Sequence, residues 1–237
     1  MQQTRLTDET ADYVARREEL RAAEIDLMRQ RERVAALRRQ LPQGAEVKDY
    51  VFTEGPNDLD TGDAPVQRTR LSELFTGPGR SLVIYHLMYG KQQTIPCPMC
   101  TMWIDGFNGV AHHVAQNVDF AIAAAADLPT LRAHARNRGW SRLRLLSCGD
   151  STFKYDLGSE AGDGNQDSTI SVFTHDGSVL RHYYTAHPAM SEDINQRGID
   201  LLSPVYNILD LTPEGRDDWY AELAYAADLN LVPGTVR

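Results

Sequence analysis

The chain has 237 residues, with 24 Lys and Arg against 33 Asp and Glu, so its formal net charge is −9 at pH 7. This acidic balance excludes a protein that binds nucleic acid by neutralising phosphates. Hydrophobic residues make up 42% of the sequence and charged residues 24%, which is typical of a globular chain and excludes wholesale disorder. No apolar run approaches the roughly 20 residues of a membrane-spanning helix, and the polar N-terminus lacks a signal-peptide core, so we expect a cytoplasmic protein without a membrane role.

Residues 8–41 predict one long helix, because they contain no Gly or Pro and consist mostly of strong helix formers. Apolar side chains recur every seven residues along one face of this otherwise charged helix, at Tyr13, Leu20, Leu27, Val34 and Leu41. Pro42 and Gly44 end the helix. We therefore expect residues 1–45 to form a helical extension whose apolar stripe packs on its own domain or, in a homodimer, on a second copy.

From residue 46 the pattern changes to short apolar strands that alternate with helical segments, which predicts an α/β domain over residues 46–237. The segment 81–90 is apolar almost throughout and predicts a central strand. A hairpin is predicted at 169–185, where Asp176-Gly177 supplies the turn. The remaining expected elements are strands at 47–52, 118–126 and 143–147, helices at 71–75, 97–116 and 128–139, and a loop over 154–167.

Two of the three cysteines form the motif Cys97-Pro98-Met99-Cys100, which follows the predicted central strand and begins a predicted helix. Free backbone N–H groups and the helix dipole stabilise an anion at a helix start, so we expect the Cys97 pKa to lie below about 8.5. The short spacing allows Cys100 to reach Cys97 within disulfide distance. The motif predicts that Cys97 attacks an electrophilic sulfur or oxygen and that Cys100 resolves the intermediate.

Several segments together resemble the thioredoxin-like superfamily, and more closely a bacterial thioredoxin-like family known as domain of unknown function 899. They are KDYVF (48–52), LSELF (71–75), SLVIYHLMYG (81–90), CPMCTMWIDGFNG (97–109), RNRGW (136–140), VFTHDGSVLRHYYT (172–185) and YNILDLTPEGRDDW (206–219). The resemblance extends from about residue 8 to residue 219. It implies a thioredoxin-like three-layer fold with a central mixed sheet, and it suggests thiol chemistry on a small-molecule or protein thiol or disulfide.

A second interpretation of the cysteine pair is a metal site, because two thiolates and an imidazole suit copper or zinc. One or two histidines would complete the shell, with His182 of the predicted hairpin as the first candidate and His86, His175 and His187 as others, because strand ends in such sheets converge near the motif. His112 and His113 lie too far along the predicted helix for this role. The redox interpretation needs no cofactor. A third, non-enzymatic interpretation is an interaction scaffold that uses the helical stripe and leaves the cysteines idle.

Four further residues are candidates for supporting roles. Trp103 shares a helix face with Cys100, and alternation along the strand puts Tyr184 on one face with His182, so both could line a substrate cleft. Asp105 could accept a proton from the resolving thiol. Cys148, which follows the strand at 143–147, is either a third redox partner or a buried and inert thiol.

Overall fold

The computed structural model describes residues 6–194 and 197–224, and the chain divides into two compact units, Met1–Gln43 and Gly44–Arg237. Helix α1, Ala11–Arg39, makes up most of the first unit. The Thr10 hydroxyl caps it by accepting a hydrogen bond from the Tyr13 N–H at 3.2 Å. No α1 side chain is buried. The long helix expected from composition is therefore confirmed.

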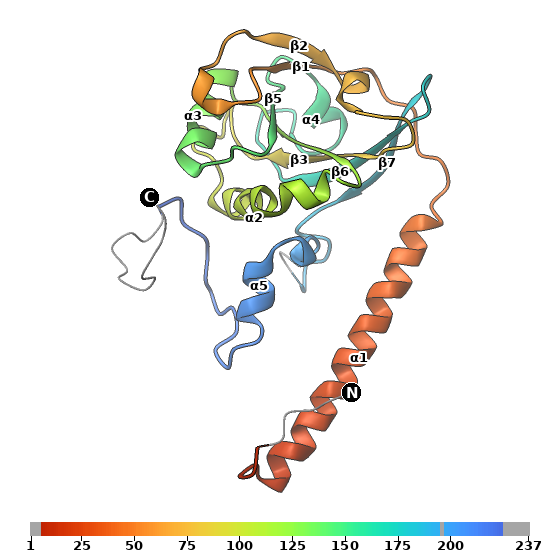
Figure 1. Cartoon of the computed structure of the whole chain (residues 1–237), viewed down its shortest axis with the longest axis vertical. Coiled ribbons are helices and arrows are strands. Elements are labelled where there is room, and N and C mark those ends of the chain that lie inside the picture. Colours follow the sequence, from red (N-terminus) through yellow and green to blue (C-terminus); the bar gives the residue numbers. More distant parts are fainter. Residues whose placement is uncertain (1–5, 195–196, 225–237) are drawn as a thin grey trace. The chain divides into compact units, whose positions relative to one another are not determined.

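The second unit is built on a seven-stranded mixed sheet in the order β2-β1-β5-β4-β3-β6-β7 (Figure 1). Strand β3 pairs in parallel with β4, and β4 in parallel with β5, whereas the other neighbours are antiparallel. The strand predicted at 81–90 is central, as expected. The strands are β1 (Val51–Glu54), β2 (Gln67–Arg70), β3 (Leu82–Leu87), β4 (Asp119–Ala124), β5 (Arg144–Ser147), β6 (Thr169–His175) and β7 (Leu180–Ala186).

Two hydrophobic cores cover the two faces of this sheet. Helices α2 (Pro98–Val114) and α3 (Leu128–Arg138) pack on one face, with Trp103 and Leu131 in the same core as Tyr85 of β3. On the other face lie α4 (Phe153–Asp156) and a short helical turn at Leu71–Leu74, which pack against Ile84 of β3. Alternate residues of β3 thus enter opposite cores. This layering confirms the expected thioredoxin-like α/β fold.

Two predicted boundaries differ from the structure, and one strand was missed. The strand expected at 47–52 is β1, Val51–Glu54, because the preceding residues pair elsewhere: Glu46 bridges to Arg181 of β7. Strand β2 was not predicted, because its polar sequence QRTR shows no apolar alternation and its pairing with β1 holds it in place. The loop expected at 154–167 begins inside α4.

A β-bulge changes which side chains of β7 share a face. Val172 of β6 pairs with Tyr184 and the next residue, Phe173, pairs with His182, so Tyr183 is the extra residue. The His182 ring lies 5.9 Å from Phe173 in one core, whereas Tyr184 packs against the opposite core. The prediction that His182 and Tyr184 share a face is therefore wrong, because it assumed unbroken alternation.

Candidate functional site

The cysteine pair lies where the central strand passes into α2. After β3 the chain turns at Gly90, and the Cys97 N–H donates to the Met88 carbonyl at 3.1 Å, which ties the motif to the strand end. Pro98 is the first residue of α2, and its ring provides the φ angle that a helix start needs. Cys97 is thus the N-cap of α2, as the sequence predicts.

The environment of Cys97 favours a thiolate. Its Sγ accepts a hydrogen bond from the Cys100 N–H, with 3.4 Å between N and Sγ. The Cys100 thiol, the N–H groups of Cys100 and Met99 and the Tyr220 hydroxyl lower the Cys97 pKa to about 6, although burial opposes them. The side chain is only 7% exposed. At neutral pH Cys97 is therefore mainly ionised and shielded from bulk water.

Cys100 has the opposite character. It is completely buried, and burial together with the negative charge at Cys97 raises its pKa well above the usual value. The structure holds both cysteines as free thiols. The buried Tyr85 hydroxyl lies beside the Cys100 thiol, and burial and the Cys100 charge raise the Tyr85 pKa. The pair thus combines one thiolate with one protonated thiol, as an attacking and a resolving cysteine require.

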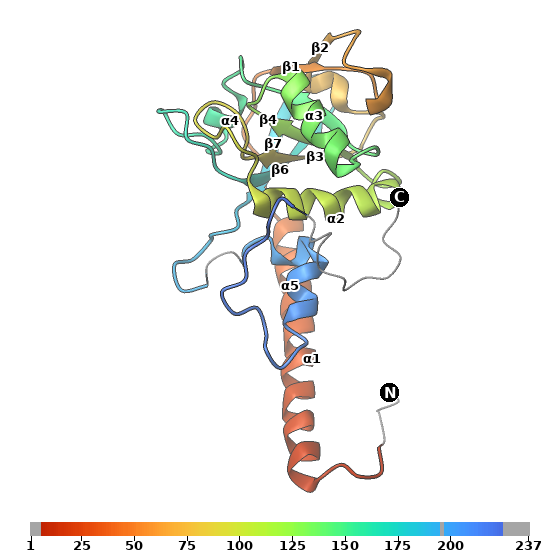
Figure 2. The ribbon, with the colours of Figure 1, turned by 90° about the vertical axis from the view of Figure 1, so that its left-hand side faces the viewer.

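A distant segment covers the pair, and the sequence alone did not indicate this. The Tyr206 hydroxyl, from α5 (Pro204–Leu209), lies 3.4 Å from the Met99 Sδ, and the Ala221 N–H lies 3.5 Å from the same atom. The hydroxyl of Tyr220, the residue before Ala221, forms a hydrogen bond with the Cys97 thiol. Figures 1 and 2 show this segment returning to the side of α2 that faces away from the sheet. We define residues 216–224 as the C-terminal strap.

A cavity of about 560 Å³ lies between the strap and α2. Apolar side chains from three segments line much of it: Met102 of α2, Val205 of α5 and Trp219 of the strap. Tyr220, which reaches Cys97, lies on its wall. The cavity therefore offers a place beside the cysteine pair where an apolar part of a substrate could lie.

Trp103 and Asp105 both have structural partners. Trp103 is 1% exposed and packs edge-to-face on Tyr206 with 5.9 Å between ring centres. The Trp103 ring is therefore buried between α2 and α5 and has no exposed surface that could line a cleft. Asp105 accepts a hydrogen bond from the Trp140 Nε1 at 2.7 Å and forms an ion pair with Arg138. These contacts hold α2 against α3. The Asp105 carboxylate binds Trp140 and Arg138 and not the Cys100 thiol.

His182 does not join the cysteines. It belongs to a line of hydrogen-bonded side chains, in which its Nε2 lies 2.7 Å from the Thr185 Oγ1 and Thr185 lies 2.9 Å from the Ser171 Oγ. Ser171 continues to the Nε2 of buried His86 at 3.0 Å, and the His86 Nδ1 lies 2.6 Å from the Ser159 Oγ. Within residues 6–194 and 197–224 no three His, Cys, Asp or Glu side chains are grouped to hold a metal ion.

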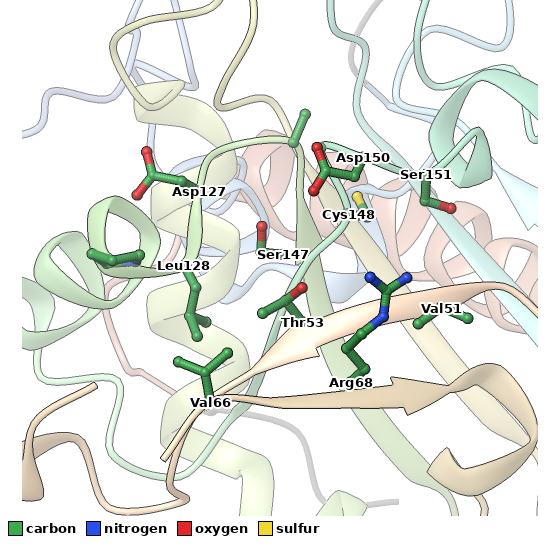
Figure 3. A pocket seen from close by; sticks show the side chains of 13 residues that line it. Val51, Thr53, Val66, Arg68, Asp127, Leu128, Ser147, Cys148, Asp150 and Ser151 are labelled. Atoms are coloured by element: carbon green, nitrogen blue, oxygen red, sulfur yellow. The ribbon is translucent and has the colours of Figure 1, made fainter. Parts of the chain in front are cut away.

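Cys148 belongs to the hydrophobic core on the other face of the sheet from the pair, at the wall of a second cavity of about 420 Å³. Its thiol donates to the Ala124 carbonyl at 3.2 Å, and burial raises its pKa to about 12. Figure 3 shows Cys148 beside Asp150 and Ser151, with Arg68 of β2 across the cavity. Cys148 is therefore a protonated thiol at neutral pH, which favours the interpretation as a buried and inert cysteine.

The fold and the site together define a thioredoxin-like α/β protein with a cysteine pair at a helix start. The chain belongs to a bacterial family of unknown function, DUF899, whose profile matches residues 1–228. A comparison with curated proteins finds no match. No helix in the described part of the chain is long and apolar enough to cross a membrane.

Solved structures similar to this chain include several peroxiredoxins. Reduced Prx3 from Vibrio vulnificus in complex with hydrogen peroxide is 20% identical, with 69% of this chain and 100% of that chain covered and a TM-score of 0.44. AhpC from Mycobacterium tuberculosis is 19% identical over 68% of this chain and 89% of that one, with a TM-score of 0.45. The reduced 2-Cys peroxiredoxin of Plasmodium vivax is 13% identical over 70% and 95%, with a TM-score of 0.46.

Proposed function

We propose that the protein is a thiol oxidoreductase that acts on a disulfide or a peroxide through Cys97 and Cys100. The observation that carries the proposal is the opposite protonation of two adjacent thiols, with the Cys97 pKa lowered to about 6 and the Cys100 pKa raised. A thiolate beside a protonated thiol is the starting state for attack followed by resolution. The two cysteine sulfurs carry out the reaction without a cofactor. A reducing compartment such as the cytoplasm would regenerate the dithiol form of the pair.

The reaction proceeds in two steps. With a disulfide, the Cys97 thiolate attacks one sulfur, the substrate S–S bond breaks, and one substrate thiolate leaves. With a peroxide, the thiolate attacks one oxygen, the O–O bond breaks, and Cys97 becomes a sulfenic acid while hydroxide or an alkoxide leaves and takes up a proton from solvent. In the second step Cys100 loses its proton and attacks the Cys97 sulfur. The Cys97–Cys100 disulfide forms, and the second thiolate or a water molecule leaves.

Mass analysis after mild oxidation tests the proposal. Treatment with hydrogen peroxide or oxidised glutathione should produce a Cys97–Cys100 disulfide in the wild-type chain. Cys97→Ser should abolish this product, and Cys100→Ser should accumulate a mixed disulfide between glutathione and Cys97. Cys148→Ser is the matched control and should behave as wild type. If neither oxidant forms the disulfide, the proposed function is wrong.

A further inference from the structure

Lys154 of α4 is a lysine inside the protein, with 1% of its surface exposed. Its Nζ donates a hydrogen bond to the Leu87 carbonyl at 2.8 Å. In the described part of the chain it forms no ion pair with a carboxylate. A buried ammonium group without an opposite charge is unfavourable, because it has lost its hydration. A negative charge that forms near Lys154 would therefore stabilise its ammonium group, and the ammonium group would stabilise that charge.

The backbone places this ammonium group at the strand end that leads into the cysteine motif. Leu87 is the last residue of β3, and the following residue, Met88, accepts the hydrogen bond from the Cys97 N–H at 3.1 Å. Leu87 also pairs in register with Ala124 of β4, whose carbonyl accepts the Cys148 thiol. Neighbouring strands lie about 4.8 Å apart. The Lys154 charge thus lies at the ends of the neighbouring strands β3 and β4, which lead to or contact the segments that carry Cys97 and Cys148.

The groups that face Lys154 are thiols and carboxylates. Burial lowers the pKa of Lys154, whereas negative charges at Cys148, Cys100, Glu160 and Asp167 would raise it. Both carboxylates have cationic or imidazole partners elsewhere, because Glu160 pairs with Lys91 and Asp167 with His187. His86 is the other titratable group that senses the Lys154 charge, and burial keeps it neutral.

Of the two thiols, Cys100 is the one that must ionise in the proposed reaction. We propose that Lys154 is a positioning residue for the cysteine pair, whose buried charge stabilises the Cys100 thiolate in the second step. This inference rests on the proposed function. In that step the Cys100 Sγ loses its proton and attacks Cys97, and the bond from Cys97 to the substrate sulfur breaks. The electron pair leaves with the substrate thiolate, and the proton from Cys100 passes to solvent.

Reaction of the reduced full-length protein with a chromogenic aromatic disulfide separates the two steps. Attack by Cys97 releases a first equivalent of coloured thiolate, and attack by Cys100 releases a second. The test variant is Lys154→Gln, which removes the charge and keeps a donor for the Leu87 carbonyl. We expect the first phase to stay within about twofold of wild type. The second phase should slow about tenfold at neutral pH, and its pH midpoint should rise by about one unit.

Three further variants make the test specific. Lys154→Arg keeps the charge and should restore most of the second-phase rate. Lys48→Met removes an exposed ammonium that pairs with Asp156 of the same helix, and it should leave both phases unchanged. Cys148→Ala should retain the second phase, which assigns that phase to Cys100. Lys154→Met is a second neutral variant in case the glutamine variant fails to fold, as judged by circular dichroism.

The outcomes separate the inference from the function on which it rests. A second phase with wild-type rate and pH midpoint in folded Lys154→Gln or Lys154→Met overturns the inference alone. The inference is also overturned if Lys154→Arg loses the second phase as completely as the neutral variants, because the charge would then not be the cause. If the wild-type protein releases only one equivalent, the proposed function fails and the inference fails with it.

Discussion

At the scale of single residues, two chemically identical side chains acquire opposite behaviour from their positions in α2. Cys97 precedes the first helical turn, where the Cys100 thiol and unpaired N–H groups stabilise its negative charge. Cys100 lies inside the turn and is completely buried, so its neutral form is favoured. This difference follows from the sequence, because a C-x-x-C motif at a helix start fixes both positions.

The contribution of Tyr220 to Cys97 can be tested by removing one oxygen. Tyr220→Phe should raise the Cys97 pKa by about 0.7 units, because an exposed hydrogen bond to the thiolate contributes about 1 kcal/mol. The rate of alkylation by iodoacetamide as a function of pH measures this pKa. Tyr155→Phe, on the exposed surface of α4, is the matched control. An unchanged pKa in Tyr220→Phe would show that the strap does not stabilise the thiolate.

At the scale of elements, the connection between β3 and α2 determines where the motif lies. Gly90 has φ of 103°, and a Cβ there would lie 2.1 Å from the Ala126 N, so only glycine allows the backbone of this turn to approach the end of β4. Gly106 and Gly109 lie inside an unbroken α2, although glycine is an unfavourable residue in a helix interior. Packing of the apolar face of α2 on the sheet outweighs their low helix propensity.

These two kinds of glycine should respond oppositely to substitution by alanine. Gly90→Ala should lower the free energy of unfolding by about 3 kcal/mol or more, because it combines backbone strain with a steric overlap. Gly109→Ala, whose Cβ would meet nothing within 4 Å, should raise that free energy by about 0.5–1 kcal/mol. Urea denaturation followed by circular dichroism measures both. Equal stability of the two variants would contradict this account of the turn.

At the scale of the whole molecule, a polar line crosses one face of the sheet within an apolar core. It runs from Ser159 through His86 and Ser171 to Thr185 and His182, and His86 also stacks on Phe153 with 4.9 Å between ring centres. Burial, and secondarily the charge of Lys154, lowers the His86 pKa well below 6.5. A neutral imidazole can satisfy both serine partners, as a donor at one nitrogen and an acceptor at the other.

This buried histidine makes the stability of the fold depend on pH. Below about pH 6.5 the unfolded chain binds a proton at His86 that the folded chain does not, so the free energy of unfolding should fall as the pH decreases. The slope for one such histidine is at most about 1.4 kcal/mol per pH unit. Urea midpoints between pH 7.5 and about pH 5 measure it. His86→Asn should be less stable at pH 7.5 but show a shallower slope, and a slope identical to wild type would exclude His86 as the source.

Self-association through α1 stays a prediction for the whole molecule. The helix has no buried side chain, and Leu20 and Leu27 are 58% and 51% exposed on its apolar stripe. Because apolar side chains at seven-residue spacing pack well against a second helix, we expect a dimer in solution. Leu20→Glu combined with Leu27→Glu should give a monomer in sedimentation velocity experiments, with Arg16→Ala as a control outside the stripe. A wild-type protein that is monomeric at all concentrations would show that the prediction is wrong.

The sequence by itself determined the fold class, the central strand and the position of Cys97 at the start of a helix. These features depend on apolar periodicity and on hydrogen bonds within one turn of a helix, which nearby residues specify. The tertiary structure decided which distant residues meet the pair. Tyr220 and Lys154 come from segments far along the chain, and a single bulge at Tyr183 turns His182 away from the core that holds the cysteines. Contacts of this kind depend on how elements pack and on strand register, which local sequence patterns do not encode.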